Sequence, residues 1–216
     1  MFIVAYYTEG TPYEVEAMAL QKSMEFVRSN AKNKARRQFS WSVQSLPHPG
    51  NWKHATQLKP AFILDQLLNA NLGLFDCLLY LDADARMVAD PSLHLDGALE
   101  DFDVAVHYFK DRELISATIA VKKTANAVMM LSRWASQCEQ HPETWSDQPL
   151  LQRVIEDMPE LKVKRLGPEF NWIDAQDPAR PVDLSERHYG PRDNIYIRQT
   201  QGSRRHKQAV NARGGA

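Results

Sequence analysis

Short apolar runs alternate along the chain with segments whose apolar residues recur at helical spacing. Residues 2–7, FIVAYY, form a continuous apolar run of strand length that ends at Thr8 and Gly10. Such a run is typical of a strand buried on both faces, as in a parallel sheet. Residues 39–45 instead alternate aromatic and aliphatic residues with polar ones, which predicts a strand with one covered face. Further strands are expected at residues 76–82, 103–109, 115–123, 161–166 and 194–199.

Four segments show the spacing and the end signals of helices. Helices are expected at residues 13–29, 60–71, 125–140 and 147–158. Pro60 suits a first helical turn, and Thr124 and Ser146 are suited to N-cap positions. Residues 46–57, rich in proline and aromatic side chains, are expected to form a loop.

The order of these elements is strand, helix, strand, helix, strand, followed by a mixed region. This order predicts an α/β fold with at least partly parallel strand pairing. No internal repeat or linker divides the chain, so we expect one domain over residues 1–206. Residues 207–216 have little core-forming content and are expected to be a flexible tail.

The composition is that of an ordinary globular protein. The 216 residues carry a net charge of −1, which gives no overall attraction to nucleic acid or anionic lipid. Two cysteines, Cys77 and Cys138, are too few for a disulfide framework. No segment has the roughly 18 apolar residues of a membrane span, and the N-terminus lacks signal-peptide features. We therefore expect a cytoplasmic protein without a membrane span and without a nucleic-acid partner.

The first chemical signal is the pair of carboxylates that ends the run LLYLD. Asp82 and Asp84 are separated by one alanine. If strand geometry continues, residues two apart point the same way, and ligands bind at the carboxyl ends of strands in open α/β sheets. Two convergent carboxylates favour a hard divalent cation such as Mg²⁺ or Mn²⁺. The alternative is a structural turn, because aspartate is common where strands end.

The stretch LLYLDADARMVADP, residues 78–91, resembles the D-x-D strand and turn of glycosyltransferases with the GT-A fold. Other stretches resemble segments of that family in the same order, namely residues 2–27, 52–67, 115–136, 145–155 and 166–173. The resemblance as a whole covers residues 2–205. The most similar members are of the glycogenin and galactosyltransferase type. The resemblance implies a single Rossmann-like domain with a mixed, mostly parallel central sheet flanked by helices.

The resemblance also implies residues that bind the nucleotide-sugar donor. Residues at the end of the first strand would hold the base and ribose, and a basic residue at a helix start would lie near the donor. The donor-binding set is Tyr6, Tyr7, Thr8, Lys59, Asp82 and Arg204. Arg198, Arg205 and Lys207 would help Arg204 to neutralise the diphosphate, although this basic tail is equally explained as a solvated chain end.

A divalent metal, Mn²⁺ or Mg²⁺, is implied at the D-x-D motif. Asp84 would be the direct ligand, and Asp82 would contact ribose or metal. Members of the family often supply a third ligand from a C-terminal histidine; here that position falls on Gln199, and His206 lies seven residues further on. Gln199 could ligate through its amide oxygen, but more weakly than imidazole, so a weaker metal affinity is expected.

Asp147 and Gln148 match the family's Asp-Gln pair beside the anomeric carbon and are the candidate catalytic residues. Asp147 has a simpler explanation, since an acidic residue in a first helical turn complements the helix dipole.

The predicted function is metal-dependent transfer of a sugar from a nucleotide-diphosphate donor, UDP being favoured, with retention of configuration. The acceptor could be a glycan, a protein or a small molecule. One alternative is a GT-A-like domain that binds a nucleotide or glycan without catalysis. Another is a haloacid-dehalogenase-type phosphatase, whose D-x-D strand normally lies near the N-terminus and is followed by threonine where Arg86 stands here.

Overall fold

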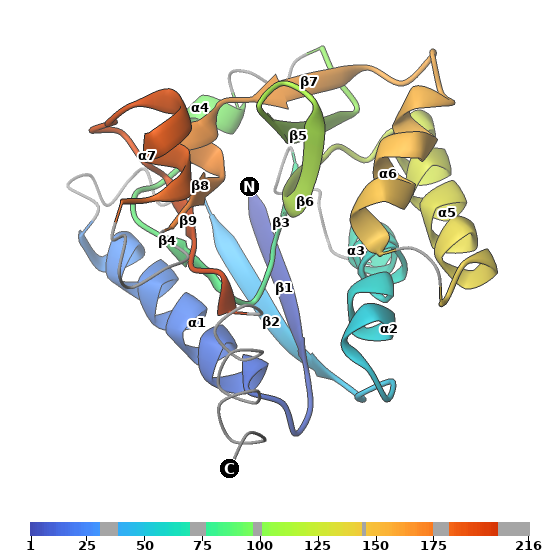
Figure 1. Cartoon of the computed structure of the whole chain (residues 1–216), viewed down its shortest axis with the longest axis horizontal. Coiled ribbons are helices and arrows are strands. Elements are labelled where there is room, and N and C mark those ends of the chain that lie inside the picture. Colours follow the sequence, from blue (N-terminus) through green and yellow to red (C-terminus); the bar gives the residue numbers. More distant parts are fainter. Residues whose placement is uncertain (31–38, 70–76, 97–100, 144–145, 175–181, 203–216) are drawn as a thin grey trace.

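In the computed structural model the described residues are 1–30, 39–69, 77–96, 101–143, 146–174 and 182–202. They form a layered α/β fold around a twisted central sheet (Figure 1). The strands are β1 (Phe2–Thr8), β2 (Ser40–Leu46), β3 (Leu78–Leu81), β4 (Ala85–Met87), β5 (Val104–Phe109), β6 (Glu113–Val121), β7 (Val163–Leu166), β8 (Trp172–Ile173) and β9 (Ile197–Gln199). The helices are α1 (Tyr13–Asn30), α2 (Trp52–Gln57), α3 (Lys59–Asn69), α4 (Ser92–Asp96), α5 (Ala125–Gln140), α6 (Asp147–Glu156), the 3₁₀ turn η3 (Pro168–Phe170) and α7 (Leu184–Tyr189).

Six strands form the central sheet in the order β2-β1-β3-β6-β5-β7. The pairs β1–β2, β1–β3 and β5–β7 are parallel, whereas β6 runs antiparallel to both of its neighbours. The predicted mixed, mostly parallel sheet is therefore confirmed. A second sheet, in the order β4-β9-β8, lies beside α1 (Figure 1).

Each face of the central sheet is covered by its own hydrophobic core. Alternate residues of β1 divide between the two: Val4 packs with α3, α5 and α6, whereas Ile3 packs with α1 and the small sheet. Trp134 of α5 and Leu20 of α1 are fully buried in these two cores. Burying a large apolar side chain contributes about 1.5–3 kcal/mol, so both helical layers are held firmly on the sheet.

Two predictions about helix ends had different outcomes. Thr124 caps α5 as predicted, because its hydroxyl accepts a hydrogen bond from the Ala127 amide. Ser146 occupies the N-cap position of α6, but its side chain makes no capping bond.

The prediction that residues 46–57 form a loop is wrong for their second half. Trp52–Gln57 form α2, which begins where the Asn51 side chain accepts a hydrogen bond from the His54 amide. The asparagine cap thus converts a proline- and glycine-rich stretch into a short helix next to α3.

Candidate active site

The D-x-D segment forms a tight turn between β3 and β4, and the expectation that strand geometry persists through it is wrong. The strand ends at Leu81, and the Ala85 amide donates a 2.9 Å hydrogen bond to the Asp82 carbonyl. The turn nevertheless keeps both carboxylates at the carboxyl end of β3. They are close enough for the charge of Asp82 to act on Asp84.

Asp84 is held by the segment that follows β9. The Gly202 amide donates a 2.6 Å hydrogen bond to Asp84 Oδ2, and the Thr200 hydroxyl donates to the Asp84 carbonyl at 2.8 Å. A Cβ at position 202 would lie only 2.9 Å from the Asp84 Cβ, so this close approach requires glycine. Burial, followed by the charge of Asp82, raises the pKa of Asp84 to about 6.

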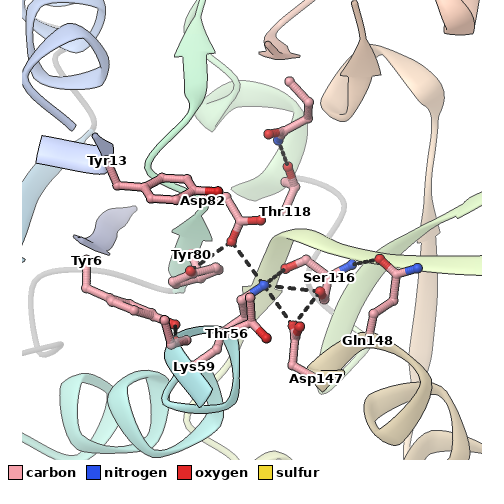
Figure 2. Close-up of polar contacts among 12 residues, drawn as sticks. Tyr6, Tyr13, Thr56, Lys59, Tyr80, Asp82, Ser116, Thr118, Asp147 and Gln148 are labelled. Carbon is pink, nitrogen blue, oxygen red and sulfur yellow. Dashed lines mark hydrogen bonds and ion pairs between the residues drawn. The ribbon is translucent and has the colours of Figure 1, made fainter. Parts of the chain in front are cut away.

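Lys59, at the start of α3, is the centre of a buried charge network (Figure 2). Its Nζ lies 3.0 Å from Asp82 Oδ1 and 2.8 Å from Asp147 Oδ2, and the side chain is only 3% exposed. Burial alone would lower the pKa of Lys59, but the charges of Asp147 and Asp82 outweigh it and hold that pKa above its ordinary value. The lysine is therefore a permanent cation that joins the D-x-D turn to the start of α6.

Ser116 of β6 completes this network. Its hydroxyl donates to Asp147 Oδ2 at 2.7 Å, and its carbonyl accepts a hydrogen bond from Lys59 Nζ at 3.2 Å. The carbonyl of Asp147 also accepts from the buried indole of Trp134 at 2.9 Å. Asp147 thus does more than complement the dipole of α6, because its carboxylate fixes Lys59.

A cavity of about 100 Å³ lies at the end of β1, on one side of the D-x-D turn. Its lining includes the three residues predicted to hold the base and ribose, Tyr6, Tyr7 and Thr8, and also Lys59. The Tyr6 hydroxyl is already used, since it donates to the Ala55 carbonyl at 2.7 Å. Among the other lining residues, sequence reasoning did not identify Tyr13, Ala55, Thr56, Tyr80 and Ala83.

A larger cavity, of about 400 Å³, lies on the other side of the turn. It shares Trp52, Asp82 and Asp84 with the first cavity, so the two cavities meet at the D-x-D motif. Gln148 and Gln199 line the second cavity only.

The predicted catalytic pair is divided between two environments. Gln148 faces the second cavity, where its Nε2 donates to Glu113 Oε1 at 3.0 Å and its Oε1 accepts from the Ser116 amide at 3.4 Å. Asp147 is only 4% exposed and lines neither cavity. A direct contact between Asp147 and a sugar is therefore not favoured by this arrangement.

The remaining predicted contacts lie in the C-terminal segment. Arg198 is held by Asp174 at 2.7 Å and Asp183 at 2.6 Å and lines neither cavity, so this arrangement does not favour a diphosphate contact. Arg204 and His206, with Arg205 and Lys207, lie outside the described residues. Within the described ranges, no group of three His, Cys, Asp or Glu residues is placed to hold a metal ion.

Gln199 belongs to a polar chain that sequence reasoning did not identify. Its Nε2 donates to the Thr118 hydroxyl at 3.0 Å, and that hydroxyl donates to Asn171 Oδ1 at 3.2 Å. Small polar residues within the apolar strand ISATIAV were the available signal, because Ser116 and Thr118 fall on alternate positions of one buried strand.

No protein-family model matches the chain, and no curated protein matches it in sequence. Solved structures do match its fold. A glycosyltransferase involved in glycosylation of the major capsid of PBCV-1 superposes with a TM-score of 0.65 at 12% identity, over 97% of both chains. The galactosyltransferase LgtC, in complex with donor and acceptor sugar analogues, gives a TM-score of 0.59 at 12% identity, over 94% of this chain and 87% of that chain.

Mouse xyloside xylosyltransferase 1 gives a TM-score of 0.53 at 10% identity, over 94% of this chain and 98% of that chain. No helix of the described ranges has the length and apolar character needed to cross a membrane.

The three superpositions extend over nearly the whole of this chain and establish a shared fold, although the sequence identity is only 10–12%. The chain therefore has the GT-A fold of the glycosyltransferases that it superposes on.

Proposed function

We propose that the chain is a glycosyltransferase that moves a sugar from a nucleotide-diphosphate donor to an acceptor hydroxyl with the help of Mn²⁺ or Mg²⁺. The observation that carries the proposal is the position of the D-x-D turn. It lies at the carboxyl end of β3, is shared by both cavities, and belongs to a chain with the fold of glycosyltransferases. A donor that spans the turn would have its nucleotide in the first cavity and its sugar in the second.

The charges around the turn support a metal-assisted mechanism. The described residues that line the two cavities include three carboxylates, Asp82, Asp84 and Glu113, and one ammonium, Lys59. The net charge of these four groups, −2, would repel a diphosphate, so a bound cation would favour donor binding. Burial, followed by the charge of Asp82, raises the pKa of Asp84, and a cation between the two carboxylates would relieve the second of these costs.

The residues present fit a hard divalent ion in part. Asp82 and Asp84 offer carboxylate oxygens, the ligand type that Mg²⁺ and Mn²⁺ prefer. Gln199 uses its Nε2 to bind Thr118, so its carbonyl oxygen is the atom it would offer to a metal. A bound ion would neutralise the diphosphate and stabilise the charge that develops as it leaves.

The chain's own groups would orient the reactants. Lys59 fixes Asp82 through a 3.0 Å ion pair, assisted by the Tyr80 hydroxyl, which donates to the same oxygen at 2.8 Å. Gln148 presents its amide at the wall of the second cavity, where a donor sugar would lie. These groups are positioned before substrate arrives, which is how an active site stabilises a transition state without reorganising. We propose UDP as the nucleotide and retention as the stereochemical outcome on the resemblance to glycogenin-type and galactosyltransferase-type enzymes.

A thermal-shift screen of nucleotides and nucleotide sugars, with Mn²⁺ or with EDTA, tests the proposal. A ligand that binds only the folded protein raises the melting temperature by mass action. We expect UDP or a UDP-sugar to raise it more with Mn²⁺ than with EDTA. Equal shifts in both conditions would contradict the metal-bridged donor. A second measurement, hydrolysis of the bound nucleotide sugar without an acceptor, distinguishes the two functions. An enzyme would hydrolyse it slowly, whereas a binding module would not.

A further inference from the structure

The side-chain amide of Asn171, between η3 and β8, is buried without a complete set of hydrogen bonds. The residue is 0% exposed, and its Nδ2 has no hydrogen-bond partner among the described residues. A buried donor left unpaired costs about 1–3 kcal/mol, so native structures rarely retain one. Asn171 lines the second cavity, where a bound molecule could supply the missing acceptor atom.

A chain of hydrogen bonds fixes the orientation of this amide. Gln199 Nε2 donates to Thr118 Oγ1, and the single proton of that hydroxyl is given to Asn171 Oδ1. A hydroxyl has only one proton to donate. Because the Thr118 hydroxyl accepts from Gln199, its own proton is available for Asn171 Oδ1. The Oδ1 end of the Asn171 amide is therefore used inside the protein, and the Nδ2 end is left as a donor.

The walls of the second cavity combine apolar and amide groups. Phe109, Ile173 and Leu184 contribute apolar surface, while Gln148 and Asn171 contribute amides. Apolar surface with a few directed polar groups is the usual composition of a small-molecule site. A saccharide matches it, because a sugar ring presents both C–H faces and hydroxyl groups.

The charged groups that line this cavity in the described part of the chain are carboxylates. They are Asp82, Asp84 and Glu113, with no Lys, Arg or His among the lining residues described. Lys59 and the proposed divalent cation would offset Asp82 and Asp84, so Glu113 is the carboxylate that would repel a carboxylate or phosphate on the incoming molecule. The cavity thus disfavours uronic acids and sugar phosphates.

We propose that the second cavity, beside the place of the donor sugar, also binds the acceptor as an uncharged saccharide, and that Asn171 Nδ2 donates a hydrogen bond to one of the acceptor's oxygens. Thr118 and Gln199 are positioning residues that hold the amide in the donating orientation. This inference rests on the proposed function, since an acceptor exists only if a sugar is transferred.

The acceptor class is tested with matched probes. Methyl glycosides of neutral hexoses, the corresponding uronic acid glycosides and the hexose 6-phosphates are offered with whichever nucleotide sugar the protein turns over, and products are detected by mass spectrometry. We expect neutral glycosides to be used at least roughly tenfold better than their anionic counterparts, the effect of about 1.4 kcal/mol of repulsion. Preference for the anionic members, or use of no neutral glycoside while the donor is hydrolysed, would overturn the inference and leave the proposed transferase intact.

Variants test the role of the amide. Asn171→Ala is expected to raise the acceptor KM roughly tenfold, as the loss of one hydrogen bond would, and to raise the donor KM much less. Asn194→Ala, at an exposed asparagine outside both cavities, is the matched control. An unchanged acceptor KM, or an equal rise in the donor KM, would overturn the assignment.

A second pair of variants keeps the test decisive if Asn171→Ala does not fold. Thr118→Val removes the hydroxyl that orients the amide, whereas Thr118→Ser retains it. We expect Thr118→Val to raise the acceptor KM and Thr118→Ser to remain within about twofold of wild type, because only the serine can continue the hydrogen-bond chain. The same KM for both variants would overturn the positioning role. Failure of every nucleotide sugar to bind or react would instead refute the proposed function itself.

Discussion

The Asp84→Asn variant distinguishes two possible roles of Asp84, that of a metal ligand and that of a structural residue in the turn. The substitution keeps the size of the side chain and a carbonyl oxygen that can accept from the Gly202 amide, but it removes the charge. In the wild-type protein the pKa of Asp84 is raised from 3.8 to about 6, which means that the folded state disfavours the ionised form. This rise in pKa corresponds to at most about 3 kcal/mol, and we expect about 1–2 kcal/mol after solvent screening.

The sign of this effect depends on pH. Below pH 3.8 the carboxyl is protonated in both the folded and the unfolded states, so wild type and Asp84→Asn should have similar stability. As the pH rises from 3.8 through about 6, the unfolded state loses its proton first, and wild type loses stability relative to the variant. Above about pH 6 the difference should be constant, with Asp84→Asn the more stable protein in EDTA.

Thermal melts with EDTA and with Mn²⁺ provide the assay. For a chain of this size, about 1 kcal/mol shifts the melting temperature by roughly 2–4 °C, so the expected gain is measurable at pH 7.5. Mn²⁺ should stabilise wild type and have little effect on Asp84→Asn. Asp193→Asn, at an exposed site outside both cavities, controls for the loss of one negative charge. A variant that is less stable than wild type in EDTA, or that responds fully to Mn²⁺, would refute the reasoning.

Three further variants probe the same site. Lys59→Met should destabilise the protein by about 3–5 kcal/mol in urea denaturation, because it leaves Asp82 and Asp147 without their shared cation; a loss below about 1 kcal/mol would contradict this. Gln148→Ala should lower kcat by roughly ten- to a hundredfold and change the affinity for UDP little, as calorimetry would measure, whereas equal losses in both would place Gln148 in nucleotide binding. Gly202→Ala should cost about 1–3 kcal/mol and weaken the Mn²⁺-dependent thermal shift, since its Cβ would lie 2.9 Å from the Asp84 side chain; an unchanged shift would show that the loop can move away.

Local patterns predicted the parts of the fold that depend on neighbouring residues. The apolar run of β1, the helical spacing of α5 and its Thr124 cap follow from such patterns and were predicted correctly. The short strands β4 and β8 have no periodicity of their own, because they contain only three and two residues. Their pairing with β9 depends on a segment far away in sequence.

The candidate site was likewise predictable only where its residues are close together in sequence. The D-x-D motif is visible in sequence, because it directly follows an apolar run of strand length. The contact between Lys59 and Asp147 joins residues from α3 and α6, and nothing near either residue predicts it. Asn171 was missed for the same reason, since its significance comes from Thr118 on β6 and from an amide nitrogen left unpaired by the fold.

Metal-dependent turnover of a nucleotide sugar tests the central claim most directly. The measurement is the release of UDP from a UDP-sugar by wild type, in Mn²⁺ and in EDTA, with Asp84→Asn as the blank. The proposed mechanism predicts release with Mn²⁺ by wild type alone, because the departing diphosphate needs the cation that Asp84 helps to hold. Equal release by wild type and Asp84→Asn, or no release from any nucleotide sugar that binds, would contradict it.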